Sequence, residues 1–164
     1  MISAMPHDQS APAPEKRLRN AEQKQADIRA QADAMGVDEA YISTLVDTFY
    51  ERVQQNELLG PIFEEVVDGL WDKHLATMKS FWGSMALGLN TYEGRPMPKH
   101  MALKGLTPEH FATWLELFYK TLQDTAPSKA AEDYFIERAA RIARGFQLNI
   151  FTYRPDAFDP DKRT

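Results

Sequence analysis

Cysteine is absent from this chain of 164 residues. Its absence excludes disulfide bonds, iron–sulfur clusters, a thiolate ligand to iron and covalent haem attachment through paired cysteines. A bound metal would therefore need histidine, methionine, tyrosine or carboxylate ligands. The sequence also has no H-E-x-x-H motif, no glycine-rich phosphate loop and no G-x-S-x-G motif. Signatures of zinc proteases, nucleotide-binding proteins and serine hydrolases are thus missing.

Long hydrophobic runs and an excess of positive charge are lacking as well. No window is apolar enough to span a bilayer, and residues 1–10 have no apolar run after a basic start, so we expect neither a membrane span nor a signal peptide. The net charge is -5 and the pI is near 5.4. An acidic chain without a basic stripe argues against binding to nucleic acid or to anionic membranes. The expected location is the cytoplasm.

Apolar residues recur at helical spacing, and no segment shows the alternation of a β-strand. The chain is therefore predicted to be all-α. Four main helices are expected, with apolar faces over residues 42–53, 70–87, 111–122 and 135–150. The apolar face of the second of these helices is expected to begin at Leu70. Asp38, Thr107 and Ser128 are placed to cap helix N-termini, and Gly36 is placed to end a helix.

The chain divides into three parts by composition. Residues 1–36 form an N-terminal extension, disordered up to Pro14 and then helical, with few large apolar side chains to bury. Residues 37–154 form the single predicted domain. Residues 155–164 are polar and read as a tail.

The longest irregular connection lies between the second and third main helices and ends near His100. Pro96 and Pro98 fix φ and stiffen the approach to this histidine. A rigidly held imidazole among apolar residues suits the axial ligand of an iron porphyrin, with Nε2 on the iron and Nδ1–H donating to a carbonyl. The alternative is an ordinary hydrogen-bonded or partly exposed histidine.

The other histidines differ in their surroundings. His7 lies in the polar start and is expected to be solvated. His110 lies in the first turn of a helix, where a surface or capping role is expected. His74 shares a helix side with Met78 and Phe81. It is either an interfacial residue or a hydrogen-bond donor or gate opposite His100.

Tyr50 and Trp114 offer a hydroxyl and an indole N–H from the first and third main helices. Both can be ordinary core residues, and a buried one needs a polar partner. Together with His74 they form three donors that converge on one cavity. Such donors would hold a diatomic ligand whose outer atom carries partial negative charge.

Seven short motifs together resemble the truncated haemoglobins, specifically group III. They are Leu45-Val46-Asp47-Thr48-Phe49-Tyr50-Glu51-Arg52-Val53, Leu59-Gly60-Pro61-Ile62-Phe63, Trp71-Asp72-Lys73-His74, Phe81-Trp82, Tyr92-Glu93-Gly94-Arg95-Pro96, His100-Met101-Ala102-Leu103 and His110-Phe111-Ala112-Thr113-Trp114-Leu115. Their combination and order carry the resemblance, which covers residues 37–153. Gly-Gly hinges are absent, which agrees with the subgroup.

The resemblance implies a two-over-two helical sandwich around non-covalent haem b. It makes His100 the proximal iron ligand, and it makes Tyr50, His74 and Trp114 the distal polar residues. No catalytic residue is assigned. The other expected haem contacts are Phe49, Phe63, Phe81, Tyr92, Arg95, Lys99 and Met101. The polar residues Tyr92, Arg95 and Lys99 are included because they could pair with the negatively charged haem propionates.

Two classes of function follow. The first is a haem protein that binds O2, NO or CO, either reversibly or with peroxidase-like or NO-detoxifying turnover, which would involve small anions or peroxide and a reductase. The alternative is a metal-free helical module whose aromatic groove binds a partner helix. The first predicts a coloured protein and the second a colourless one.

Overall fold

The computed structural model describes residues 13–92 and 105–152, and predictions made for other residues lie outside the described residues. Within these ranges the chain forms helices and no strand, which confirms the all-α class. The elements are α1 (Pro14–Met35), α2 (Glu39–Gln55), α3 (Leu59–Val67), α4 (Trp71–Leu87), α6 (Pro108–Thr125), α7 (Lys129–Gln147) and a π-helical turn η1 (Leu148–Thr152).

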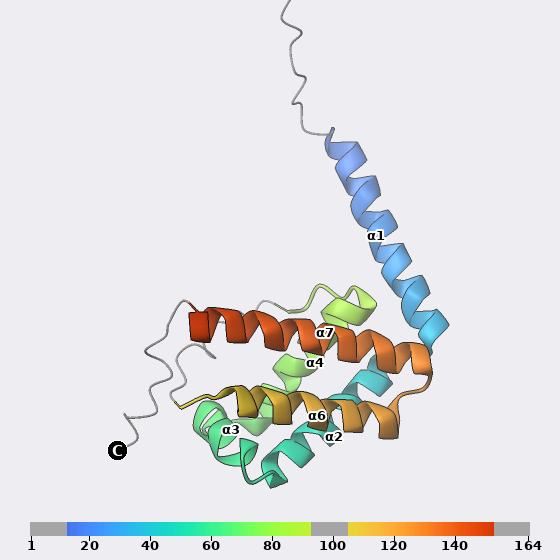
Figure 1. Cartoon of the computed structure of the whole chain (residues 1–164). Coiled ribbons are helices and arrows are strands. Elements are labelled where there is room, and N and C mark those ends of the chain that lie inside the picture. Colours follow the sequence, from blue (N-terminus) through green and yellow to red (C-terminus); the bar gives the residue numbers. More distant parts are fainter. Residues whose placement is uncertain (1–12, 93–104, 153–164) are drawn as a thin grey trace, which may run out of the picture.

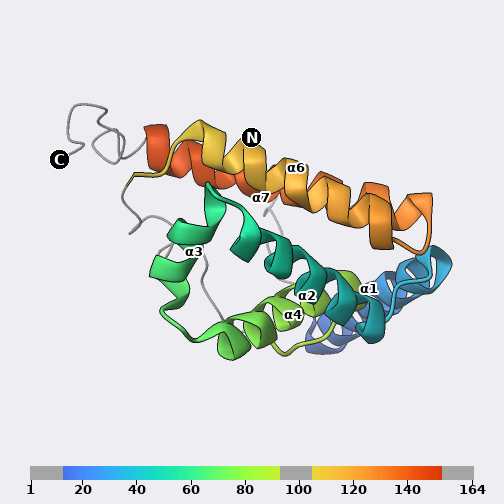
Figure 2. The same ribbon diagram turned by 90° about the horizontal axis from the view of Figure 1, so that it is seen from below.

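Four of these helices form two packed layers. The antiparallel pair α6 and α7 makes one layer, and α2 and α4 make the other (Figure 1; Figure 2). α2 packs on both α4 and α6, so it joins the layers, while α3 closes one end of the stack. This arrangement confirms the two-over-two sandwich that the resemblance implies.

The predicted helix ends are confirmed at three positions. The Asp38 side chain accepts a hydrogen bond from the Tyr41 backbone N–H at 2.8 Å, which caps α2. Ser128 Oγ accepts from the Ala131 N–H at 3.1 Å and thereby caps α7. Gly36 ends α1 with φ 77°, in the left-handed region that glycine adopts most easily.

His110 takes part in capping α6. The Thr107 backbone N–H donates to His110 Nδ1 at 3.1 Å, and the Thr107 hydroxyl lies 2.9 Å from the same nitrogen. Because the N–H donates to it, Nδ1 is the unprotonated ring nitrogen and also accepts from the hydroxyl. Thr107 and His110 therefore form a capping box, which confirms the capping role.

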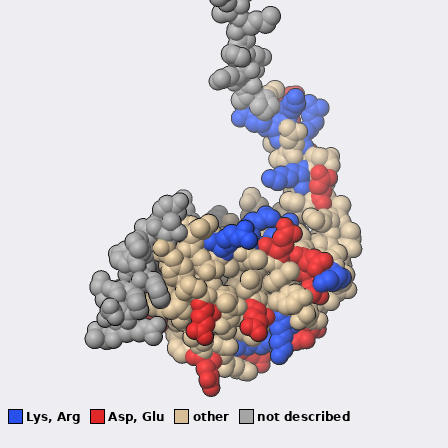
Figure 3. All heavy atoms as spheres, in the orientation of Figure 1, with Lys and Arg blue, Asp and Glu red and all other residues tan. Residues whose placement is uncertain are grey.

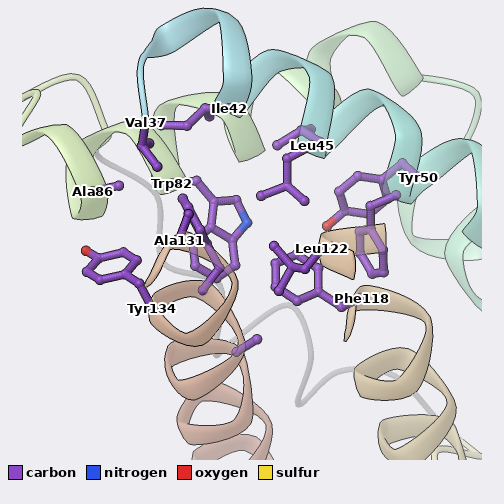
Figure 4. Close-up of a cluster of buried hydrophobic side chains, with 14 of the residues drawn as sticks. Val37, Ile42, Leu45, Tyr50, Trp82, Ala86, Phe118, Leu122, Ala131 and Tyr134 are labelled. Atoms are coloured by element: carbon purple, nitrogen blue, oxygen red, sulfur yellow. The ribbon is translucent and has the colours of Figure 1, made fainter. Parts of the chain in front are cut away.

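Aromatic rings fill the space between the two layers (Figure 4). Trp82 of α4 stacks on Phe118 of α6, with ring centroids 5.3 Å apart and an interplanar angle of 15°. Phe135 of α7 is fully buried and meets Trp82 edge-on at 5.5 Å. Such pairs add to the stabilisation from burial alone. The core therefore depends on rings that come from both layers.

One expected apolar position is wrong. Leu70 was expected to begin the inward face of a helix, but 59% of it is exposed. The reason lies in the backbone, because Leu70 precedes the first helical residue and has φ -94° and ψ 48°. Asp68 and Gly69 before it have positive φ. They form a turn, and Leu70 belongs to this turn and not to α4.

The extension helix α1 projects beyond the two layers (Figure 1). Its last turns pack on α4 and α7, and Ala32 and Met35 are buried in the core. The Gln25 side chain also donates to the Gly88 carbonyl at 3.1 Å. The outer turns are exposed, including Leu18, and carry clustered Lys and Arg side chains (Figure 3). The apolar surface that this helix buries is thus confined to its C-terminal half.

Candidate functional site

Tyr50 lies at the centre of an aromatic enclosure formed by three helices. Its ring on α2 is buried, with 5% of the residue exposed. Ring centroids lie 4.9 Å away for Phe49 and 5.8 Å away for Phe63 of α3. On α4, the His74 ring lies 4.8 Å away and the Trp71 ring 6.3 Å away. The predicted residues Tyr50 and His74 are therefore brought into direct contact.

His74 is held edge-on by three rings. Its imidazole is perpendicular to the Tyr50 ring and to the Trp71 ring, at 4.8 Å and 5.9 Å between centroids. The Phe63 ring lies 6.3 Å away at 68°. The residue is half-buried. These contacts fix the plane of the imidazole and leave it limited room to turn.

Burial raises the pKa of Tyr50 above the ordinary tyrosine value of 10.0. The physical cause is desolvation, because a phenolate in an aromatic enclosure loses its hydration. A tyrosine hydroxyl is protonated at neutral pH, and burial extends this state to higher pH. The hydroxyl can therefore act as a hydrogen-bond donor to a small molecule in the enclosure.

Trp114 joins this group through Phe49. The Phe49 ring lies between the two, 4.9 Å from Tyr50 and 5.7 Å from Trp114, nearly perpendicular to the latter. Trp114 also stacks in parallel on Phe118, with centroids 5.6 Å apart. Of the three predicted donors, Tyr50 and His74 are therefore in contact. Trp114 is separated from Tyr50 by the ring of Phe49.

A cavity of about 60 Å³ lies beside Trp114, between α6 and α7. Its walls are mostly apolar and are formed by Leu106, His110, Phe111, Trp114, Ala143 and Phe146. Leu106 follows closely in sequence on the segment 93–104 that contains His100. Trp114 therefore lines this cavity and also contacts Phe49 of the aromatic group around Tyr50.

Phe81 and Tyr92, each predicted as a haem contact, lie against each other. Their ring centroids lie 5.2 Å apart at 73°. Tyr92 is half-buried, and burial raises the pKa of its hydroxyl above 10.0. Phe63, the remaining described aromatic of the predicted set, packs against Tyr50. His100, Arg95, Lys99 and Met101 lie outside the described residues.

Two residues near the site were not predicted as part of it. Trp71 contacts both Tyr50 and His74, and its Nε1–H donates to Glu64 Oε1 at 2.9 Å. Glu64 is exposed and accepts this bond. The signal for Trp71 was its spacing, because a residue three positions before His74 lies on the same side of a helix. No sequence signal indicated Glu64.

No group of three or more His, Asp or Glu side chains in 13–92 and 105–152 is arranged to hold a metal ion. Over the same ranges, no helix is long and apolar enough to cross a membrane.

Known proteins resemble this chain in sequence and in fold. The family model described as "Bacterial-like globin" matches residues 32–147. The chain is 33% identical over 120 residues to the group 3 truncated hemoglobin ctb of Campylobacter jejuni, covering 71% of this chain and 94% of that protein. The crystal structure of the group III truncated hemoglobin from Campylobacter jejuni superposes with a TM-score of 0.67, at the same identity and the same two coverages.

A second solved structure is more distant. The group II truncated hemoglobin from Bacillus anthracis is 28% identical and superposes with a TM-score of 0.59, covering 71% of this chain and 88% of that one. The matched family model, the sequence identity and the two-over-two layers agree with one another. The chain therefore belongs to the bacterial-like globins, and within them to the group III truncated haemoglobins.

Proposed function

We propose that this protein binds haem b non-covalently, with His100 as the proximal iron ligand, and that it binds diatomic gases on the side of Tyr50 and His74. Truncated globins are a family that typically binds haem and such gases, which supports the proposal. The observation that carries the proposal is the contact between the buried ring of Tyr50, which bears a hydroxyl, and the imidazole of His74. Their ring centroids lie 4.8 Å apart within an aromatic enclosure.

The apolar character of the described residues supports the proposed haem site. A flat apolar macrocycle needs aromatic and aliphatic walls, and the walls beside Trp114 and around Tyr50 consist almost entirely of such side chains. A haem-bound gas needs donors that are buried, and Tyr50 supplies one. In the proposal, Phe49, Phe63 and Phe81 form part of these walls. Met101 would contact the ring, and Tyr92, Arg95 and Lys99 would bind its propionates.

The haem would supply the iron at which a gas molecule binds. The chain's own residues would then hold that molecule. Tyr50 would donate its hydroxyl hydrogen to the outer atom, because this hydroxyl stays protonated in its buried position. His74 and Trp114 would offer further N–H donors. Aromatic walls exclude water, which strengthens each of these hydrogen bonds.

Redox turnover is part of the same proposal. Three polar groups beside an iron would also stabilise peroxide or another small anion, as peroxidase-like or NO-detoxifying chemistry needs. Such turnover consumes electrons, so a reductase is the expected partner. Stopped-flow mixing of the oxygenated protein with NO tests this extension. Fast, stoichiometric nitrate formation would support it, and slow or absent nitrate formation would count against it.

The central test is the absorption spectrum of the purified protein in its ferric and ferrous forms. A haem protein shows a strong Soret band that shifts on reduction and again on addition of CO. His100→Ala should lose haem or change its ferrous spectrum, while His7→Ala should leave both unchanged. A His100→Ala protein that retains haem with an unaltered ferrous spectrum would refute the assignment of the ligand.

The metal-free interaction module is not favoured. It would use the aromatic side chains as a groove that binds a partner helix. Membership of the globin family, which typically binds haem, speaks against it. A colourless protein of full stability, which takes up no added haem, would reverse this judgement. The cytoplasmic location stays a prediction.

A further inference from the structure

A side-chain hydrogen bond joins α3 to α4 next to the Tyr50 enclosure. Trp71, the first residue of α4, donates its Nε1–H to Glu64 Oε1 of α3 at 2.9 Å. Glu64 is exposed and Trp71 is half-buried. The indole therefore has its polar edge at a surface carboxylate while its ring packs inward.

The inward side of Trp71 meets the two distal candidates. Its ring is perpendicular to the His74 imidazole at 5.9 Å and tilted against the Tyr50 ring at 6.3 Å. His74 follows Trp71 by three residues, so both side chains emerge from the same side of α4. Any rotation of the indole therefore changes the space available to the imidazole.

The backbone between the two helices is a tight turn. Asp68 has φ 50° and Gly69 has φ 74°, both in the left-handed region. Within the described residues, the backbone hydrogen bonds of this turn are Asp68 N–H to the Glu64 carbonyl and Leu70 N–H to the Val67 carbonyl, at 2.9 and 3.0 Å. The bond from Trp71 to Glu64 is a side-chain tie across this turn, and it fixes the orientation of the indole.

We propose that Glu64 is a positioning residue that holds Trp71 against His74 and thereby restricts the entry of gas ligands. Glu64 does not touch the ligand, and its effect is exerted through the indole. The inference rests on the proposed function, because it concerns access to the same pocket. Ligand access would thus depend on the surface carboxylate of Glu64 and on the indole N–H of Trp71.

The expected effect falls on ligand entry more than on ligand retention. Without the carboxylate the indole gains rotational freedom, and His74 loses one of the three rings that confine it. Entry then becomes faster. The Tyr50 hydroxyl is untouched by the change, so the escape of a bound ligand that depends on this donor should change little.

The first experiment measures CO association and O2 dissociation by flash photolysis and stopped flow on the haem-loaded full chain. Glu64→Ala should raise the CO association rate about threefold, a size typical of one exposed hydrogen bond, and should leave O2 dissociation within about twofold of wild type. Glu65→Ala is the matched control, because Glu65 is the adjacent exposed carboxylate on the same helix and forms no bond to Trp71.

Two more variants separate positioning from a general structural effect. Glu64→Gln retains an acceptor oxygen and should restore most of the wild-type association rate. Trp71→Phe retains an aromatic ring but removes the N–H, so it should raise the rate as Glu64→Ala does. The double variant Glu64→Ala/Trp71→Phe should then be no faster than Trp71→Phe alone, because both changes remove the same bond.

A second readout needs no ligand kinetics. The indole N–H of Trp71 should give a ¹H–¹⁵N resonance that shifts, and a hydrogen-exchange rate that rises, in Glu64→Ala but not in Glu65→Ala. A wild-type protein that binds no haem would overturn the proposed function and the role in ligand entry with it. A haem-loaded wild type whose Glu64→Ala and Glu65→Ala variants share the same rates and the same indole resonance would overturn this inference alone.

Discussion

The rings of Tyr50 and His74 meet at a right angle with their centroids 4.8 Å apart, although they come from the two different helices of one layer. Such an edge-to-face contact is favourable and also directional. The relative position of α2 and α4 therefore determines how these two polar side chains face the proposed ligand pocket. Changes to either residue should be read out in ligand kinetics.

Tyr50→Phe should accelerate the dissociation of O2 from the haem-loaded protein. The change removes one hydrogen bond and leaves the ring in place. A bond of about 1.4 kcal/mol corresponds to about a tenfold higher dissociation rate. Tyr41→Phe is the control, since Tyr41 is on the same helix and its hydroxyl pairs with Thr125 at 3.3 Å instead. Equal dissociation rates in wild type and Tyr50→Phe would exclude Tyr50 as a donor.

Tyr50 should also make the fold sensitive to alkaline pH. Burial raises its pKa above 10.0, so the folded state keeps a proton that the unfolded state releases. The contribution of this group to stability is complete below pH 10.0 and is lost as the pH rises above it. Denaturant titrations at about pH 8 and about pH 11 should show wild type losing more stability than Tyr50→Phe. Parallel losses in the two proteins would contradict the assignment.

Ser128→Ala should destabilise the protein through two lost hydrogen bonds. Ser128 Oγ accepts from the Ala131 N–H at 3.1 Å and donates to the Met35 carbonyl at 2.7 Å. Loss of such a cap costs about 1 kcal/mol, and the second bond adds to that figure. Urea denaturation measures the change. The half-buried Ser43, inside α2, provides the comparison, and Ser43→Ala should change the free energy of unfolding less.

His110 should weaken the fold at mildly acidic pH. Desolvation lowers its pKa below 6.5, with nearby Glu109 opposing the shift. The unfolded state therefore takes up the proton first. The contribution of His110 is complete above pH 6.5 and is lost as the pH falls below that value, because a protonated Nδ1 no longer accepts from Thr107.

His110→Gln provides the test of this pH dependence. A glutamine side chain can accept from the Thr107 N–H but does not titrate. The variant should therefore match wild type near neutral pH and retain more of its stability at about pH 5. If both proteins lose the same free energy of unfolding over this interval, the titrating group is another one.

The helices and their ends were largely predictable from the sequence, because their causes are local. Apolar spacing, the caps Asp38 and Ser128 and the stop at Gly36 depend on neighbours within one turn. Leu70 was misplaced because it belongs to the left-handed turn made by Asp68 and Gly69 and precedes the first helical residue, Trp71. A non-glycine residue, Asp68, adopts one of these conformations.

The candidate site was predictable in part. Residue types and family motifs indicated Tyr50, His74 and Trp114, yet periodicity alone does not tell that Phe49 lies between Tyr50 and Trp114. The hydrogen bond between Trp71 and Glu64 depends on the angle between α3 and α4. That angle results from tertiary packing, so the sequence indicated no role for Glu64, whereas the position of Trp71 three residues before His74 did place it on the same side of the helix.

The bond from the Ser128 hydroxyl to the Met35 carbonyl also bears on where the autonomous folding unit starts. Ala32 and Met35 lie inside the core, so the final turns of the first helix are an integral wall of the globin. A truncated gene product that starts at Val37 would open a gap along α4 and α7 and would leave that hydroxyl without its acceptor. The outer turns of α1, by contrast, project from the domain, so a fused sequence can be attached there without disturbing the pocket.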